Sequence, residues 1–149
     1  MISIKEEEID SEDGKRLIEK LSDTLEKITG SSGKDSFDNS DMLNPRSIFV
    51  IARDENKAVG CGALREITSD IAEIKRMYAV EKNRGIGKMI LLKLENKAKE
   101  FGYLKVVLET RKCNKNAVRF YLSNGYRIID NYGKYKEMAQ AICFEKLLR

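Results

Sequence analysis

Residues 81–103 read EKNRGIGKMILLKLENKAKEFGY, and this stretch marks a change in the pattern of the chain. Its apolar residues recur at helical spacing and predict a helix over about 85–101. These apolar residues are Ile86, Ile90, Leu94, Ala98 and Phe101. Gly102 follows, at the position where helices commonly end in glycine. Two glycines, Gly85 and Gly87, stand among basic residues where this helix begins.

A helix start of this composition is suited to binding an anion. The first four N–H groups of a helix lack intrahelical partners, and the helix dipole adds partial positive charge there. Glycine lets the backbone approach a ligand closely, so the stretch predicts a cradle for a phosphate or pyrophosphate. The candidate residues are Lys82, Asn83, Arg84, Gly85, Ile86, Gly87 and Lys88. An ordinary helix start with a solvated basic end is the alternative.

Two common phosphate-binding loops do not match. A P-loop needs a glycine at position 82 and Ser or Thr after Lys88, but the chain has Lys82 and Met89. A dinucleotide-binding loop needs a third glycine, where the chain has Ile90.

The rest of the chain predicts one α/β domain, residues 1–149, with a mixed sheet. Before the glycine pair, the expected elements are a strand from Ile2, a helix over 12–28 and strands over 46–54, 57–67 and 70–80. After it, they are strands over 103–110, 126–130 and 139–148 and a helix over 114–124. Gly60 and Gly62 inside one strand indicate a bulge or a close approach of backbone.

Composition narrows the classes of function. The net charge of +4 is spread through the sequence, which argues against nucleic acid as a partner, and no apolar run is long enough for a membrane span. The chain has no predicted signal peptide and three scattered cysteines, so we expect free thiols and a cytoplasmic location. The chain has no histidine, which excludes a histidine base. Its cysteines match no zinc-binding pattern, so we expect no metal.

Two blocks of sequence resemble the GNAT-type N-acetyltransferases. The segment 82–87, KNRGIG, is similar to that family's acyl-CoA loop, Gln/Arg-x-x-Gly-x-Gly/Ala, with Lys82 at the first position. The second block is Asn114-x-x-Ala117-x-x-x-Tyr121-x-x-x-Gly125-Tyr126, which resembles the family's Asn-x-x-Ala-x-x-x-Tyr-x-x-x-Gly-Phe/Tyr. The resemblance spans about residues 47–147 and departs in one place: the stretch before the glycine loop looks two residues shorter than usual.

This resemblance implies a mostly antiparallel sheet flanked by helices, with a splayed pair of parallel strands at about 74–80 and 104–110. It implies that acetyl-CoA places its pyrophosphate on the amides of residues 82–87 and its pantetheine in the gap between those strands. A backbone N–H near Met77 or Tyr78 would stabilise the oxyanion that forms when an amine attacks the thioester. Lys88 and Asn114 complete the expected cofactor contacts.

The resemblance also implies catalytic roles. Tyr121 is the candidate general acid for the leaving thiolate, although it is equally placed to be a packed aromatic residue. Asn114 is a helix N-cap candidate as well as a cofactor ligand. For the base that deprotonates the amine, Glu73 and Glu109 are the candidates in the two splayed strands. Strand alternation puts Glu73 on one face with Lys75 and Met77, and pairing with Lys75 or solvation is its structural alternative.

The leading prediction is direct transfer of an acetyl group from acetyl-CoA to a primary amine of a small molecule. A protein N-terminal or lysine N-acetyltransferase and a non-catalytic acyl-CoA-binding domain are the alternatives. The acceptor is not encoded in any motif we can identify, and residues 12–45 are expected to form its walls. A homodimer is expected only because relatives commonly form one.

Overall fold

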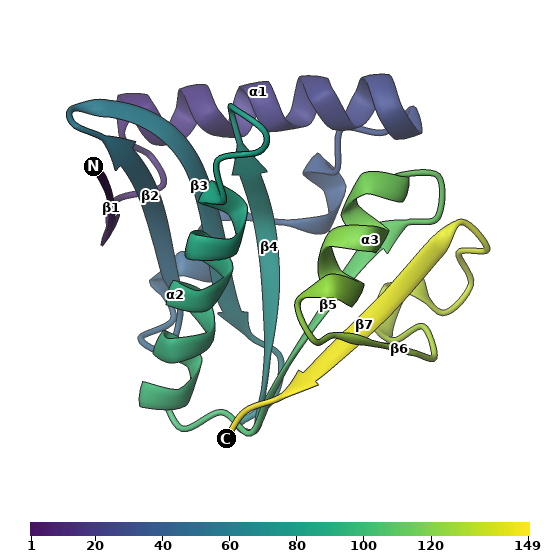
Figure 1. Ribbon diagram of the computed structural model, residues 1–149. Helices are drawn as coiled ribbons and strands as arrows, with labels where there is room; N and C mark the ends of the chain where they lie inside the picture. The colour runs from purple at the N-terminus through teal and green to yellow at the C-terminus, as the bar shows by residue number, and fades with distance from the viewer.

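A single seven-stranded sheet forms the centre of the computed structural model, which describes residues 1–149 (Figure 1). Its strand order is β1-β2-β3-β4-β5-β7-β6. The strands are β1 (Ile2–Glu6), β2 (Ile48–Asp54), β3 (Lys57–Glu66), β4 (Ile71–Ala79), β5 (Lys105–Arg111), β6 (Arg127–Ile129) and β7 (Ala141–Leu147). The helices are α1 (Glu12–Thr29), α2 (Ile86–Glu100) and α3 (Lys115–Ser123), with short 3-10 turns η1 (Lys34–Ser36), η2 (Asn39–Leu43) and η3 (Gly133–Tyr135).

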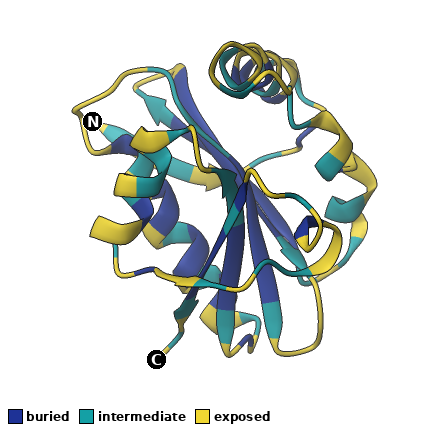
Figure 2. Ribbon diagram, turned by 90° about the vertical axis from the view of Figure 1, so that its right-hand side faces the viewer, coloured by how far each residue is buried: buried dark blue, intermediate teal, exposed yellow.

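Helices cover both faces of the sheet. Leu17 of α1 packs on one face in a cluster with Phe49 and Ile51 of β2. On the other face, Ile90 and Leu94 of α2 belong to the larger core. The central strands are therefore buried on both sides, while the outer surfaces of the helices face solvent (Figure 2). This two-sided burial explains why the strand segments read as apolar runs rather than as a strict alternation.

The two strand glycines allow α2 to approach the sheet. A Cβ on Gly60 would lie 2.7 Å from the Tyr78 carbonyl oxygen and 2.9 Å from Ile90 Cδ1. A Cβ on Gly62 would lie 2.8 Å from both Ile90 Cγ2 and Met77 Sδ. The close approach expected from sequence is confirmed, and it fixes the position of the start of α2.

β4 and β5 are the only parallel neighbours, and they separate after a short contact. Their register covers three pairs, from Ile71 with Lys105 to Glu73 with Val107. Beyond Glu73 the two strands diverge toward α1, as Figure 1 shows. The predicted mixed, mostly antiparallel sheet with a splayed parallel pair is confirmed.

A bulge in β4 changes the direction in which its side chains point. Arg76 has φ +58°, and Gly62 of β3 stands opposite both Arg76 and Met77, between regular pairs on either side. Lys75 and Tyr78 consequently face the same way, toward α1, whereas Met77 packs in the α2 core. The prediction that Met77 shares a face with Lys75 was wrong, because an inserted residue shifts the period of two by one.

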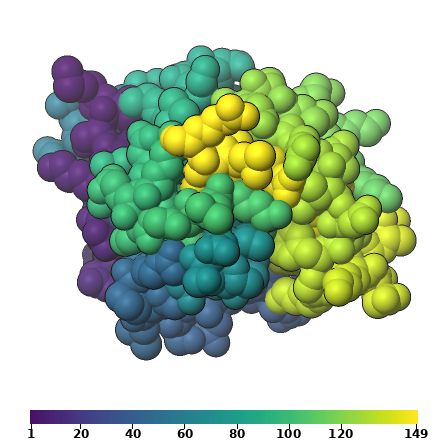
Figure 3. Space-filling model, turned by 90° about the horizontal axis from the view of Figure 1, so that it is seen from below, coloured from purple at the N-terminus to yellow at the C-terminus, as the bar shows by residue number.

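The C-terminal strand lies between two strands that precede it in the sequence. β7 pairs antiparallel with β5 on one side and with β6 on the other. At its end the Leu148 N–H donates to the Leu104 carbonyl oxygen at 2.9 Å, and Figure 3 shows the yellow C-terminus beside green residues from around position 100. This order closes the second half of the sheet beside the gap between β4 and β5.

Candidate active site

Two cavities meet where β4 and β5 diverge. The large cavity, of about 500 Å³, lies between the start of α2 and α3. The small cavity, of about 140 Å³, extends from it toward β5 and the loop after α1. Six residues line both cavities and so form the junction: Leu21, Leu25, Met77, Asn114, Ala117 and Tyr121.

The start of α2 is open toward the large cavity. Gly85 is its N-cap at φ +73°, and no side chain caps the exposed N–H groups. A Cβ on Gly87 would lie 3.4 Å from the Phe120 ring, and both residues line the large cavity. The missing side chain at Gly87 therefore keeps space free beside unpartnered backbone donors.

The large cavity brings together most of the predicted cofactor residues. Those in its lining are Met77, Tyr78, Lys82, Asn83, Gly85, Ile86, Gly87, Lys88 and Asn114. Arg84 is the exception, because its guanidinium turns away to Asp54 at 2.9 Å and to Glu81 at 3.5 Å. The Arg84 side chain thus ties the loop to the β2–β3 hairpin instead of lining the cavity.

Tyr121 lies at the junction of the two cavities. Its ring is 7% exposed and packs at 5.6 Å from the ring of Tyr126 and at 5.9 Å from that of Phe144. Burial raises the pKa of the Tyr121 phenol, so the hydroxyl stays protonated at neutral pH. Tyr121 is a packed aromatic residue, as one sequence interpretation has it, and it also lines both cavities, while its role as a general acid stays a prediction.

Asn114 has a structural role at the same junction. It is the N-cap of α3, and its Oδ1 accepts a hydrogen bond from the Ala117 N–H at 3.3 Å. Its side-chain Nδ2 is not used by this cap, so Asn114 can cap the helix and still offer a donor to a ligand.

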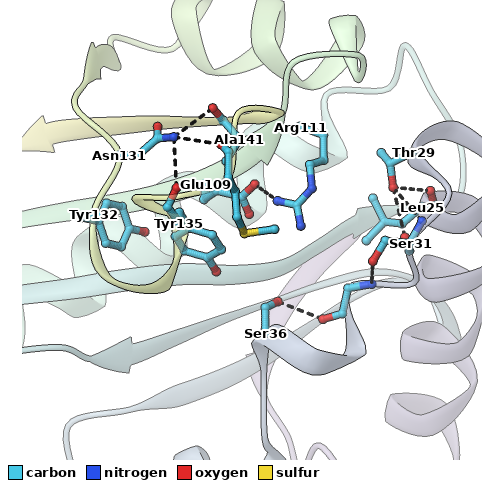
Figure 4. A network of polar contacts seen from close by, with 12 residues as sticks. Leu25, Thr29, Ser31, Ser36, Glu109, Arg111, Asn131, Tyr132, Tyr135 and Ala141 are labelled. Atoms are coloured by element: carbon cyan, nitrogen blue, oxygen red, sulfur yellow. Dashed lines mark hydrogen bonds and ion pairs between the residues drawn. The ribbon is translucent and has the colours of Figure 1, made fainter.

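Glu109 is the carboxylate that the fold brings to the small cavity. Its side chain is 7% exposed and pairs with Arg111 two residues on, as Figure 4 shows. Burial raises the pKa of the Glu109 carboxyl, with Arg111 and Lys75 opposing that shift. A carboxylate of raised pKa inside a cavity can accept a proton from an amine more readily than an exposed one.

Glu73, the other candidate base, is occupied elsewhere. It lies in neither cavity lining and is 1% exposed. One carboxylate oxygen accepts from Arg65 Nε at 2.9 Å, and the other accepts from the Tyr132 hydroxyl. The sequence suggested that Glu73 pairs with Lys75 or is solvated, and it does neither, because Arg65 and Tyr132 are its partners. Glu73 sits at the last paired position of β4 and β5, where it links β3 and the segment after β6.

Several lining residues carried no signal in the sequence. Lys75, Arg76 and Arg111 line the small cavity, and Phe120 lines the large one. Lys75 and Arg76 belong to a run of four consecutive β4 residues, Ile74 to Met77, that lines the small cavity. No group of three or more His, Cys, Asp or Glu side chains is placed to hold a metal ion, and no helix is long and apolar enough to cross a membrane.

Comparison with known proteins agrees with the fold. The profile of the Acetyltransferase (GNAT) family matches residues 14–126. The chain is 27% identical over 136 residues to an "IAA acetyltransferase" of Azospirillum brasilense, covering 89% of each protein. An acetyltransferase structure from Streptococcus agalactiae superposes with a TM-score of 0.80 at 22% identity, covering 99% of this chain and 98% of the other.

A third comparison concerns a protein solved with a ligand. A GNAT family acetyltransferase from Elizabethkingia anophelis with acetyl-CoA bound matches with a TM-score of 0.73 at 21% identity, covering 99% of this chain and 98% of that one. The chain described here belongs to the GNAT acetyltransferase family, and it is an acyltransferase enzyme.

Proposed function

We propose that this protein transfers an acetyl group from acetyl-CoA directly to a primary amine of a small molecule. The observation that carries the proposal is the junction of the two cavities: an open helix start lines one, a buried carboxylate lines the other, and Tyr121 lines both. The ligand-bound GNAT relative supports acetyl-CoA as the donor.

The large cavity has the features that a CoA pyrophosphate needs. Backbone N–H groups at the start of α2 have no side-chain cap, Gly87 leaves the space in front of Phe120 free, and Lys82 and Lys88 add positive charge. When bound there, acetyl-CoA supplies an activated acetyl thioester. Asn114 and Met77, at the junction, would position its reactive end.

Two side chains divide the proton transfers. Glu109, in the small cavity, takes the proton from the acceptor ammonium, either directly or through a water molecule. Tyr121, with a phenol kept protonated by burial, holds the proton that the leaving sulfur requires. Glu73 has no part in this scheme, because both of its oxygens are already bonded within the fold.

The size of the small cavity supports a small acceptor. Its volume of about 140 Å³ resembles that of an engineered cavity that holds benzene. An acceptor of that size or a single extended side chain would fit, whereas a folded polypeptide segment would not.

The test combines binding with turnover. Thermal unfolding with increasing acetyl-CoA should show a saturable rise of roughly 5–10 °C at about 100 times the dissociation constant. Free CoA thiol is then measured over a panel of small primary amines, and mass spectrometry of proteins incubated with labelled acetyl-CoA tests the protein-substrate alternative. No shift at millimolar acetyl-CoA would remove the proposal. Binding without turnover on any amine would leave an acyl-CoA-binding domain, and labelling of proteins alone would move the acceptor to a polypeptide.

A further inference from the structure

The charged residues divide between the two cavities. Lys82 and Lys88 line only the large cavity, together with Glu81. The small cavity has its own set, which is Lys75, Arg76, Glu109 and Arg111. Donor binding explains the first set but not the second, so the charges of the small cavity need a separate reason.

Arg76 is a buried cation without a carboxylate partner. It is 8% exposed, and none of the ion pairs within 4.0 Å involves it. Its Nη2 donates to the Gly33 carbonyl oxygen at 3.2 Å, while its buried Nε has no hydrogen-bond partner at all. A buried polar atom without a partner is costly, so the position of this guanidinium is maintained against a penalty. Arg76 lines the small cavity, and its Nη1 donates to no protein group, so Nη1 is the donor that a ligand there could use.

Lys75 is a second cation of the same kind. It is also 8% exposed and has no carboxylate within 4.0 Å. Its Nζ donates to Ser36 Oγ at 3.0 Å and to the Tyr135 hydroxyl at 2.8 Å, both of them neutral groups. Burial lowers the pKa of the Lys75 ammonium to about 8, so its charge is mostly present at neutral pH although its surroundings disfavour that charge.

The remaining two charges cancel each other. Glu109 and Arg111 form an ion pair at one side of the small cavity, and Figure 4 shows the two side chains pointing toward each other. Neither Arg76 nor Lys75 has a carboxylate within 4.0 Å, although Glu73 and Glu109 attract the Lys75 charge from farther away, so positive side chains outnumber negative ones in the lining of the small cavity. Such a site repels a simple cationic amine and attracts an acceptor that brings its own negative charge.

We propose that the acceptor amine carries a carboxylate, which binds to Arg76 and Lys75 while its amino group is held toward Glu109. This inference rests on the proposed function and specifies its substrate class: a small amino acid or a similar zwitterion. The arginine fork and the ammonium supply donors for the carboxylate. At the other end, the Glu109 carboxylate, which Arg111 holds in the cavity lining, accepts a hydrogen bond from the amino group. The cavity volume of about 140 Å³ limits the group between the two ends to a few heavy atoms.

The first test measures carboxylate binding without requiring turnover. Thermal unfolding is followed with saturating CoA while propanoate or benzoate is added, with propanamide and benzamide as matched neutral probes at constant ionic strength. We expect a saturable rise in Tm of about 3–6 °C at ten times the dissociation constant for a carboxylate and no rise for its amide. Equal shifts for acid and amide would overturn the proposal.

Variants then locate the binding site. Arg76→Gln should abolish the carboxylate shift, and Arg149→Gln, which removes the same charge from the exposed C-terminal residue, should leave it unchanged. Arg76→Lys keeps the charge but loses the fork, so its shift in Tm should be intermediate. If Arg76→Gln does not fold, Arg76→Lys and Lys75→Met are measured in its place. A carboxylate shift that survives in Arg76→Gln, or that Arg149→Gln also removes, would contradict the assignment.

The second test uses turnover and separates the two proposals. We expect kcat/KM for glycine, L-alanine or β-alanine to exceed that for the corresponding primary amide at least tenfold, and Arg76→Gln to bring the ratio within threefold. Rapid acetylation of neutral amines with no preference for an acid would remove the carboxylate inference and keep the acetyltransferase. Absence of an acetyl-CoA shift would remove the proposed function instead.

Discussion

The two long helices of this protein begin in opposite ways. The start of α1 is closed: Ser11 Oγ accepts from the Gly14 N–H at 3.0 Å, and Glu12 and Asp13 add negative charge in the first turn. The start of α2 has neither feature, since its N-cap is Gly85, no side chain caps it, and its first turn contains no acid.

This difference separates a structural helix start from one that is available to a ligand. Backbone N–H groups at a helix start need partners wherever they lie, and α1 supplies them from its own sequence. In α2 the same groups face a cavity of about 500 Å³ flanked by lysines. In α1 the cap and the acidic residues stabilise the N–H groups of the helix start within the folded chain. In α2 these groups can be satisfied by a bound anion instead.

The largest expected effect is on acetyl-CoA affinity, and it comes from placing an acidic residue in the first turn of α2, as α1 already has. Gly87→Asp places a carboxylate in the first turn of α2, where the helix tolerates it but a pyrophosphate does not. We expect acetyl-CoA affinity to fall at least about 100-fold, or about 2.7 kcal/mol, measured by isothermal titration. Lys15→Gln makes the same change of charge in the first turn of α1 and should leave the affinity unchanged. Similar losses in both variants would show that only net charge matters.

The second prediction separates binding at α2 from chemistry at the junction. Tyr121→Phe removes one hydroxyl from the junction and leaves the α2 start intact. We expect kcat to fall about 100-fold or more, as for loss of a general acid, with the dissociation constant of acetyl-CoA within twofold to threefold. Parallel losses in kcat and in affinity would assign Tyr121 to packing alone.

The third prediction concerns the side-chain charge at the open helix start. Lys88→Ala should weaken acetyl-CoA binding about 3–10-fold at low salt, and the difference should shrink as ionic strength rises. Lys99→Ala, at the exposed other end of α2, is the matched control and should change little. A salt-independent loss at Lys88 would argue against a phosphate contact.

The smallest effect is expected at α1. Ser11→Ala removes the cap that satisfies the Gly14 N–H, so the free energy of unfolding should fall by about 1 kcal/mol and Tm by about 2–4 °C. Acetyl-CoA affinity, measured on the same variant, should not change. A loss of affinity here would mean that the two helix starts are coupled and that the contrast between them is incomplete.

The sequence predicted the parts of the structure that depend on local pattern. Helix periodicity located α1, α2 and α3 within one or two residues, and Gly102 and Gly125 adopt φ of +90° and +89° just after α2 and α3. The loop residues 82–88, except for the Arg84 side chain, reach one cavity because adjacent residues at a helix start must face the same region.

The remainder depended on contacts between distant residues. The bulge at Arg76 arises from the pairing of β4 with β3, and it reversed the facing of Met77 relative to Lys75. From sequence Glu73 is a candidate base, but its oxygens accept hydrogen bonds from Arg65, on the neighbouring strand β3, and from Tyr132, which is 59 residues away in the sequence. The insertion of β7 between β5 and β6 likewise follows from long-range pairing that no local signal encodes.

The three-pair contact between β4 and β5 has a consequence for cooperativity. The ladder β1-β2-β3-β4 and the ladder β5-β7-β6 share backbone hydrogen bonding only next to Ile71–Glu73. Beyond that point side-chain contacts, such as those of Glu73 with Tyr132 and of Lys75 with Tyr135, hold the two parts together. Amide hydrogen exchange should therefore resolve two units with different opening free energies. A ligand that spans the gap would tie these units to each other, and the slower exchange it imposes would extend to strands it does not touch.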